Sequence, residues 1–167
     1  MHKKVLTEQS IYFGDVSMPK HWEIDRVDLA HHILHSTFKD TQILPSKTFD
    51  KLSVYIKDFT KLKHDINLVD YETWGSIYKP QEKSIPLLHI NPVDLRNSPD
   101  YTLLYGVQVK DCSVRIHYDD NRRKGRSWDM PLRNNQFIMF PSTNMYYITN
   151  DQKDSLNFIQ TITYEYM

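Results

Sequence analysis

Two segments in the first part of the chain carry apolar residues at the spacing of a helix. In residues 25–36, DRVDLAHHILHS, Asp25 can cap the helix, and the apolar positions are Val27, Ala30, Ile33 and Leu34. In residues 48–63, TFDKLSVYIKDFTKLK, Thr48 can cap a second helix. Their apolar stripe is Phe49, Leu52, Tyr55, Ile56, Phe59 and Leu62. The pattern predicts two helices.

After these helices the apolar period changes to two, as in strands. The segments concerned are residues 74–78, 86–90, 102–109, 113–118, 136–140, 145–149 and 155–166. Short β-prone pieces also surround Gly14 within residues 5–16. Two helices followed by closely spaced strands predict a mainly β fold, an antiparallel sandwich or barrel buttressed by helices. We expect a single domain over 1–167, with the helices in 1–65 and the β core in 66–167.

The composition is that of one globular domain, and the net charge limits the classes of partner that the chain is expected to bind. Apolar residues make up 40% of the 167 residues and charged residues 25%, a balance typical of soluble proteins. Lys+Arg and Asp+Glu both total 21, so the formal net charge is zero. Neutrality argues against general nucleic-acid binding and against attraction to a membrane surface. It suits a subunit of a larger assembly.

The sequence predicts a protein that stays in a reducing cytoplasm. No apolar run approaches the ~18 residues of a membrane span, and the basic residues of MHKKVLTEQS precede no hydrophobic segment. The single cysteine, Cys112, excludes an intrachain disulfide and a cysteine-based zinc site. We expect it to be a small core residue.

Several enzyme classes lack their signatures. Four glycines in all leave no phosphate-binding or dinucleotide loop, and no G-x-S-x-G elbow occurs. Asp111 precedes Cys112 and would raise the pKa of its thiol, which disfavours a nucleophile. His31 and His35 share a helix face with His32 between them, but no acidic residue completes a zinc motif. We therefore expect these three histidines to lie on the surface of the helix without binding a metal.

A basic stretch separates two of the predicted strands. The segment 118–131, YDDNRRKGRSWDMP, holds Arg122, Arg123, Lys124 and Arg126, followed by Trp128. One interpretation is a solvated hairpin tip whose charges are balanced by nearby aspartates. The other is a contact for an acidic partner or a phosphate. Because Trp and Arg often dominate interfaces, these residues are candidates for partner binding, as is the segment from His89 to Asp100.

Four stretches of the β region resemble one family. They are WGSIY from Trp74, LYGVQV from Leu104, FPS from Phe140, and SLNF from Ser155. They are similar to the strands of small 2-oxoglutarate/iron(II) oxygenases, in which H-x-H or H-x-D follows a Trp-led strand. A distal histidine then follows an FPS strand, and an R-x-S strand completes the pattern. The resemblance covers roughly residues 70–167 and implies a double-stranded β-helix, or jelly roll, of about eight strands.

The resemblance also implies where a metal site would lie. The first ligand position falls on His89, its partner on Asn91, and the distal histidine on Tyr146. The arginine that would pair with 2-oxoglutarate falls on Ser155. An iron site of this type needs two histidines and a carboxylate, and serine cannot replace the bidentate grip of arginine. These positions therefore predict a degenerate site.

His117-x-Asp119 is an alternative metal-binding pair. Both residues lie on one face of the strand expected at 113–118, which is favourable for chelation. No histidine follows position 117, so the usual downstream ligand is missing. If the chain were an active oxygenase, His89, His117 and Asp119 would be its candidates, with iron(II) and 2-oxoglutarate as cofactors.

The whole chain resembles proteins encoded by contractile-tailed phages of cyanobacteria, through the strings YFGDVSMPKH, NPVDLRNSPD and YDDNRRKGRSWD. This second resemblance implies an origin rather than an activity. The missing ligands, the zero net charge and the aromatic and basic pieces favour a non-catalytic jelly-roll protein without cofactors. Such a protein would be a phage structural subunit, made in the host cytoplasm, that contacts other subunits of the virion. Two alternatives remain open: an active iron(II)/2-oxoglutarate oxygenase, and a jelly roll that binds a small ligand or sugar by tyrosine stacking.

Overall fold

The computed structural model describes residues 1–5, 8–19, 22–39, 47–118 and 125–167, and this part of the chain is mainly β. Its helices are α1 (Arg26–Lys39), α2 (Lys47–His64) and the short η2 (Leu95–Asn97). Its strands are β1 (Tyr12–Asp15), β2 (Leu68–Tyr78), β3 (Tyr101–Gln108), β4 (Cys112–Tyr118), β5 (Arg126–Leu132), β6 (Gln136–Pro141), β7 (Tyr146–Asn150) and β8 (Asn157–Tyr166).

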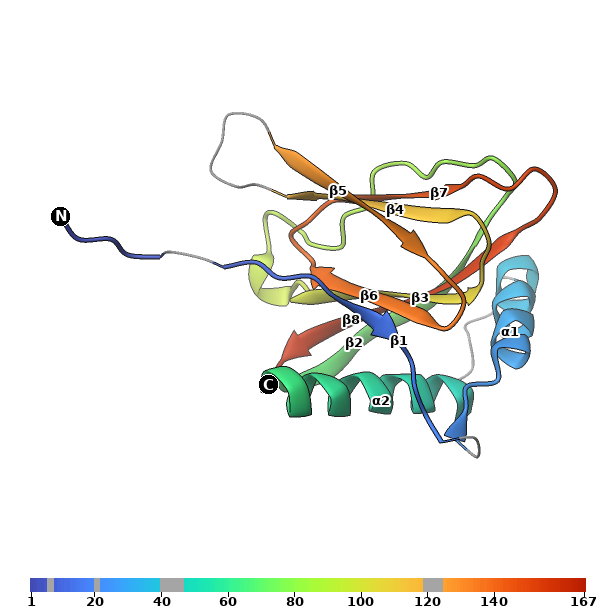
Figure 1. Ribbon diagram of the computed structural model, residues 1–167, viewed down its shortest axis with the longest axis horizontal. Helices are drawn as coiled ribbons and strands as arrows, with labels where there is room; N and C mark the ends of the chain where they lie inside the picture. Colours follow the sequence, from blue (N-terminus) through green and yellow to red (C-terminus); the bar gives the residue numbers. More distant parts are fainter. Residues whose placement is uncertain (6–7, 20–21, 40–46, 119–124) are drawn as a thin grey trace.

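The strands form two antiparallel sheets that face each other (Figure 1). The larger sheet has the order β1-β6-β3-β8-β2, and the smaller has the order β5-β4-β7. The segment after β2 extends the smaller sheet beside β7, through bridges from Lys83 to Thr149 and from Leu87 to Tyr146. This arrangement is the double-stranded β-helix that the sequence predicts.

The larger sheet is buried on both faces. One face packs on α1 and α2 with residues such as Ile33, Leu103 and Ile162. The other faces the smaller sheet with residues such as Leu104 and Ile159. A strand with two buried faces loses the alternation of apolar and polar residues, which explains why β3 reads as a nearly continuous apolar run. In β8 the alternation remains, and the second buried face includes polar residues such as Thr161 and Thr163.

The helices were predicted in the right places, but the buried face of α1 was not. Asp25 caps α1 as predicted, because its Oδ1 accepts a hydrogen bond of 3.0 Å from the backbone N–H of Asp28. The helix buries Leu29 with Ala30 and Ile33, whereas Val27 is 66% exposed. Ile33 packs closely on β2, where a Cβ on Gly75 would lie 2.8 Å from Ile33 Cγ2.

Other expectations have mixed outcomes. Cys112 is buried, and burial raises the pKa of its thiol to about 12, so it behaves as a core residue. His31 and His35 lie exposed on α1. The prediction missed β5, because only Met130 and Leu132 of that strand are buried. No helix in the described ranges is long and apolar enough to cross a membrane.

Candidate functional site

His89 and Tyr146 meet at one end of the barrel. Tyr146 is the first residue of β7 and pairs with Leu87 through two backbone hydrogen bonds of 2.9 and 3.0 Å. That pairing places His89, two residues further along, so that its Nε2 lies 2.5 Å from the Tyr146 hydroxyl. The rings of Trp74 and Phe140 pack around the pair, at 4.9 Å from His89 and 5.1 Å from Tyr146 respectively.

Burial sets the charge states of the pair. It lowers the pKa of His89, because an imidazolium is poorly solvated there. It raises the pKa of Tyr146, which is 1% exposed, so the phenol keeps its proton. The tyrosine hydroxyl can therefore donate to Nε2 of a neutral imidazole that carries its proton on Nδ1. The arrangement is an uncharged hydrogen-bonded pair.

Two other positions implied by the resemblance have structural partners of their own. The Asn91 side-chain oxygen accepts a 3.0 Å hydrogen bond from the Val93 backbone, and the Asn91 backbone N–H donates to Ser98 Oγ at 2.8 Å. These contacts form the turn that leads into η2. The Ser155 carbonyl accepts a 3.0 Å hydrogen bond from Asn150, the last residue of β7. Ser155 thus lies at the other end of β7 from Tyr146.

The alternative triad of His89, His117 and Asp119 is not assembled. The His117 ring packs on Tyr147 at 5.2 Å, whereas His89 contacts Tyr146. Neighbouring residues of a strand point to opposite faces, so the two histidines lie on opposite faces of the smaller sheet. Asp119 falls outside the described residues.

The candidate partner contacts are only partly described. Arg122, Arg123 and Lys124 also fall outside the described residues. Arg126 is exposed at the start of β5, and Trp128 is 45% exposed and makes an edge contact of 6.1 Å with Phe13. Partner binding at these residues stays a prediction.

The donors beside His89 do not fit an iron site of the expected kind. That site takes two imidazoles and a carboxylate, whereas these positions offer one imidazole, one phenol and one amide. Within the described part of the chain, no group of three His, Cys, Asp or Glu side chains could hold a metal ion.

Comparison with known proteins identifies the fold. No family model and no curated protein matches the sequence. A prolyl-4-hydroxylase from Pseudomonas putida superposes with a TM-score of 0.67 at 11% identity, over 94% of this chain and 86% of its own. The fold is that of the iron(II)/2-oxoglutarate oxygenases.

Further oxygenase-fold structures cover almost all of this chain. The non-heme α-ketoglutarate-dependent epimerase SnoN of nogalamycin biosynthesis gives a TM-score of 0.65 at 8% identity, over 93% of this chain and 77% of SnoN. The non-heme monooxygenase ThoJ, in a nickel complex, gives a TM-score of 0.64 at 12% identity, over 95% of this chain and 74% of ThoJ. The likeness therefore extends beyond residues 70–167 to the N-terminal helices.

These matches contradict two predictions from the sequence. The expected non-catalytic structural subunit is wrong, because the structures named above are a prolyl-4-hydroxylase, an epimerase and a monooxygenase, all of them enzymes. The expected absence of cofactors is also wrong, since SnoN was solved with Fe3+ and α-ketoglutarate. The sequence argument depended on a few ligand positions, whereas the likeness depends on the path of nearly the whole backbone.

Trp74 is a residue of this site that the sequence argument used only as a strand marker. Its ring contacts the His89 imidazole edge-on, with 4.9 Å between the ring centroids. Its place in the Trp-led strand was the signal by which the sequence could have identified it. The site is therefore a neutral, aromatic environment around one imidazole.

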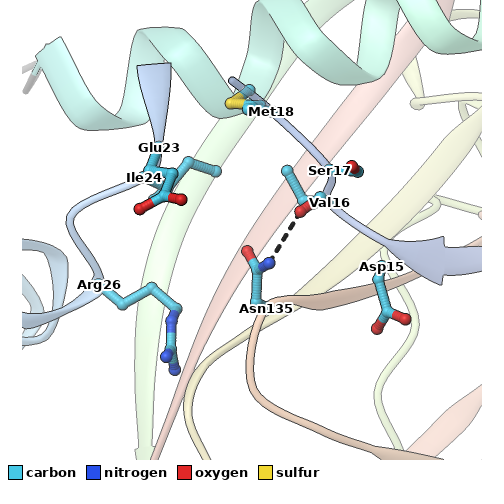
Figure 2. A pocket seen from close by; sticks show the side chains of 8 residues that line it. All are labelled: Asp15, Val16, Ser17, Met18, Glu23, Ile24, Arg26 and Asn135. Carbon is cyan, nitrogen blue, oxygen red and sulfur yellow. Dashed lines mark hydrogen bonds between the residues drawn. The ribbon is translucent and has the colours of Figure 1, made fainter. Parts of the chain in front are cut away.

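A cavity of about 510 Å³ lies at the other end of the barrel, where β6 begins (Figure 2). Arg26 and Asn135 line it on two sides, and Met18 and Ile24 close its top in that view. The Asn135 side-chain amide donates to the Val16 carbonyl at 2.8 Å, and the Arg26 guanidinium donates to the Val107 carbonyl of β3 at 3.1 Å. These contacts fasten the N-terminal segment to the sheet, so we regard the cavity as a structural junction.

The buried imidazole predicts a pH dependence of stability. The pKa of His89 is lower in the folded chain than the 6.5 of an unfolded one, so below about pH 6.5 the unfolded chain binds more protons. The His89 contribution is present above that pH and is lost as pH falls toward the folded pKa. Urea unfolding between pH 7.5 and pH 5 should show that acid lowers the free energy of unfolding less for His89→Gln than for the wild-type chain. Equal losses would contradict this charge assignment.

Proposed function

We propose that this chain is an iron(II)/2-oxoglutarate-dependent oxygenase whose reaction centre lies at His89. The observation that carries the proposal is the match of nearly the whole backbone to catalytic oxygenases. His89 supports it further, because the one histidine that the resemblance assigns to the metal lies at an end of the barrel, between the sheets.

The contribution of the chain's own residues follows from the geometry. Burial keeps the His89 imidazole neutral, which is the form that binds a metal or accepts a proton. Trp74 and Tyr146 fix its orientation from two sides. The incomplete donor set opposes the proposal and predicts weak metal binding, so we derive no catalytic step through iron.

Metal titration tests the proposal. Calorimetry of the chain, purified without air, should show one equivalent of iron(II) bound, more tightly with 2-oxoglutarate present, and consumption of 2-oxoglutarate under oxygen. His89→Ala should abolish both signals. Tyr147→Phe is a matched control, because this neighbouring ring lies on the other face of the sheet. Absence of binding at millimolar iron(II) would contradict the proposal.

An origin in a contractile-tailed cyanobacterial phage stays a prediction. It depends on the strings quoted above, and nothing in the fold bears on it. The same holds for a single domain over 1–167 and for protein partners in a larger assembly. An oxygenase encoded by such a phage would act in the cytoplasm of its host.

A further inference from the structure

His89 and Tyr146 lie closer together than two ligands of one metal ion would. The His89 Nε2 atom is 2.5 Å from the Tyr146 hydroxyl oxygen. Two atoms that bind one metal at about 2.0–2.2 Å, at right angles or wider, are roughly 3 Å or more from each other. The observed distance is instead at the short end of the hydrogen-bond range. The two residues are therefore arranged as a hydrogen-bonded pair and not as two metal ligands.

This hydrogen bond uses the nitrogen that a metal ion would need. A neutral imidazole has one unprotonated nitrogen, whose lone pair can accept a hydrogen bond or bind a metal, but not both at once. Burial keeps the phenol of Tyr146 protonated and the imidazole of His89 uncharged. When the hydroxyl donates to Nε2, the imidazole proton lies on Nδ1. Neither ring nitrogen is then open to a metal.

The sheet fixes the tyrosine in this position. Tyr146 pairs with Ile116 of β4 on one side and with Leu87 on the other. Its ring packs against Phe140 and is 1% exposed. Because its backbone is paired on both sides and its ring is enclosed, Tyr146 cannot turn its hydroxyl into solvent without disturbing the sheet.

Opening the pair would leave a buried hydroxyl without this partner. His89 lies two residues after the bridge between Leu87 and Tyr146, and its side chain is partly exposed, so His89 is the partner that can move. If it moved, the Tyr146 hydroxyl would stay in the core. A buried hydroxyl that loses its hydrogen bond is costly, and this cost opposes any ligand that competes for Nε2.

We propose that the Tyr146 hydroxyl closes the His89 imidazole to divalent transition-metal ions. Tyr146 is then a positioning residue, which acts through His89 by deciding which imidazole nitrogen carries the proton. The missing donors and this hydrogen bond both weaken metal binding, but only the hydrogen bond can be removed without adding a ligand. The consequence for iron(II) rests on the proposed function, whereas the closed pair itself does not.

Tyr146→Phe separates this role from that of a metal ligand, because it removes an oxygen donor and adds none. Nickel(II) is the first probe, since it binds imidazole more tightly than iron(II) does. Binding at His89 is the part of the calorimetric signal that is lost in His89→Ala. We expect Tyr146→Phe to bind nickel(II) there roughly tenfold more tightly than the wild type, because the competing hydrogen bond is gone. Weaker or unchanged binding would overturn the proposal.

Tyr105→Phe is the matched control. Tyr105 is also fully buried, and its hydroxyl donates to Asn135 Oδ1 at 2.8 Å. It belongs to the core between the larger sheet and the helices, whereas Tyr146 belongs to the core between the sheets. Both variants lose one hydrogen-bonded hydroxyl, and only Tyr146→Phe should change metal affinity. An equal gain in affinity for Tyr105→Phe would indicate a general effect of a weakened core, and the proposal would fail.

Nitrogen NMR of the metal-free chain tests the closed pair directly. The imidazole signals of His89 are assigned with His89→Gln. At neutral pH the wild type should show a protonated Nδ1 and an unprotonated, hydrogen-bonded Nε2. Tyr146→Phe should shift both signals toward a mixture of the two tautomers, and Tyr105→Phe should leave them unchanged. A proton on Nε2 in the wild type, or the same signals in Tyr146→Phe, would overturn the proposal.

Iron(II) and 2-oxoglutarate then separate this inference from the proposed function. Tighter nickel(II) binding by Tyr146→Phe, without iron-dependent consumption of 2-oxoglutarate by either chain, would support the closed pair and remove the oxygenase. Iron-dependent consumption that needs His89, with the same metal affinity in the wild type and in Tyr146→Phe, would support the oxygenase and overturn the closed pair.

Discussion

The double variant Asn91→Asp/Tyr146→His should bind iron(II) roughly 100-fold or more tightly than the wild-type chain, because it completes two imidazoles and a carboxylate. In the wild type, the phenol that faces His89 at 2.5 Å is kept protonated by burial and is a poor metal ligand. Aspartate at position 91 can still accept the hydrogen bond from Val93 that shapes the turn. Anaerobic calorimetry measures the change.

Three variants make this test specific. Each single substitution should improve affinity less than the pair, because each supplies one donor. Adding His89→Ala to the double variant should return binding to the wild-type level or below. Tyr146 is a core residue, so its replacement costs stability, and the folded state must be checked by an unfolding curve before titration. An equal affinity for the double variant and the wild type would show that His89 is not positioned for metal binding.

Gly106→Ala should destabilise the fold by about 3 kcal/mol. A Cβ at this position would overlap the carbonyl oxygen of Arg133 and lie 2.9 Å from its carbonyl carbon. Both belong to backbone rather than to a flexible side chain, so the end of β3 or the turn before β6 must move. That turn is held by a 2.8 Å hydrogen bond from the Asn135 N–H to the Gly106 carbonyl. Urea unfolding measures the loss.

Gly14→Ala is the matched control for that measurement. A Cβ at Gly14 would lie 3.7 Å from the Phe137 ring, an ordinary contact distance. Both glycines lie in strands and neither has a positive φ, so the two substitutions differ mainly in the space available. Similar stabilities for the two variants would contradict the packing of the turn against β3.

The sequence predicts this fold well because two-residue alternation and a helical stripe are local signals. It misses β5, whose residues are mostly exposed, because a strand with little burial has no apolar pattern. It also misjudges α1, where Val27 and Leu34 are apolar but exposed. Which apolar residues of a helix face the sheet depends on how the helix packs, and that information is not local.

The site was predictable in position but not in geometry. The resemblance placed the first ligand position on His89, by its spacing from Trp74, and the distal position on Tyr146, four residues after Ser142. The structure brings Trp74, His89 and Tyr146 together. Their contact depends on the pairing of Leu87 with Tyr146, which joins distant segments and leaves no local trace in the sequence.

The position of β8 has a consequence for synthesis on the ribosome. This strand lies between β3 and β2 and pairs with both, although it follows both of them in the sequence. A nascent chain that lacks it has two sheet edges with no partner and an apolar face on each side of the gap. The barrel therefore cannot close progressively as it emerges, and folding must wait for the release of residues 157–166 from the exit tunnel.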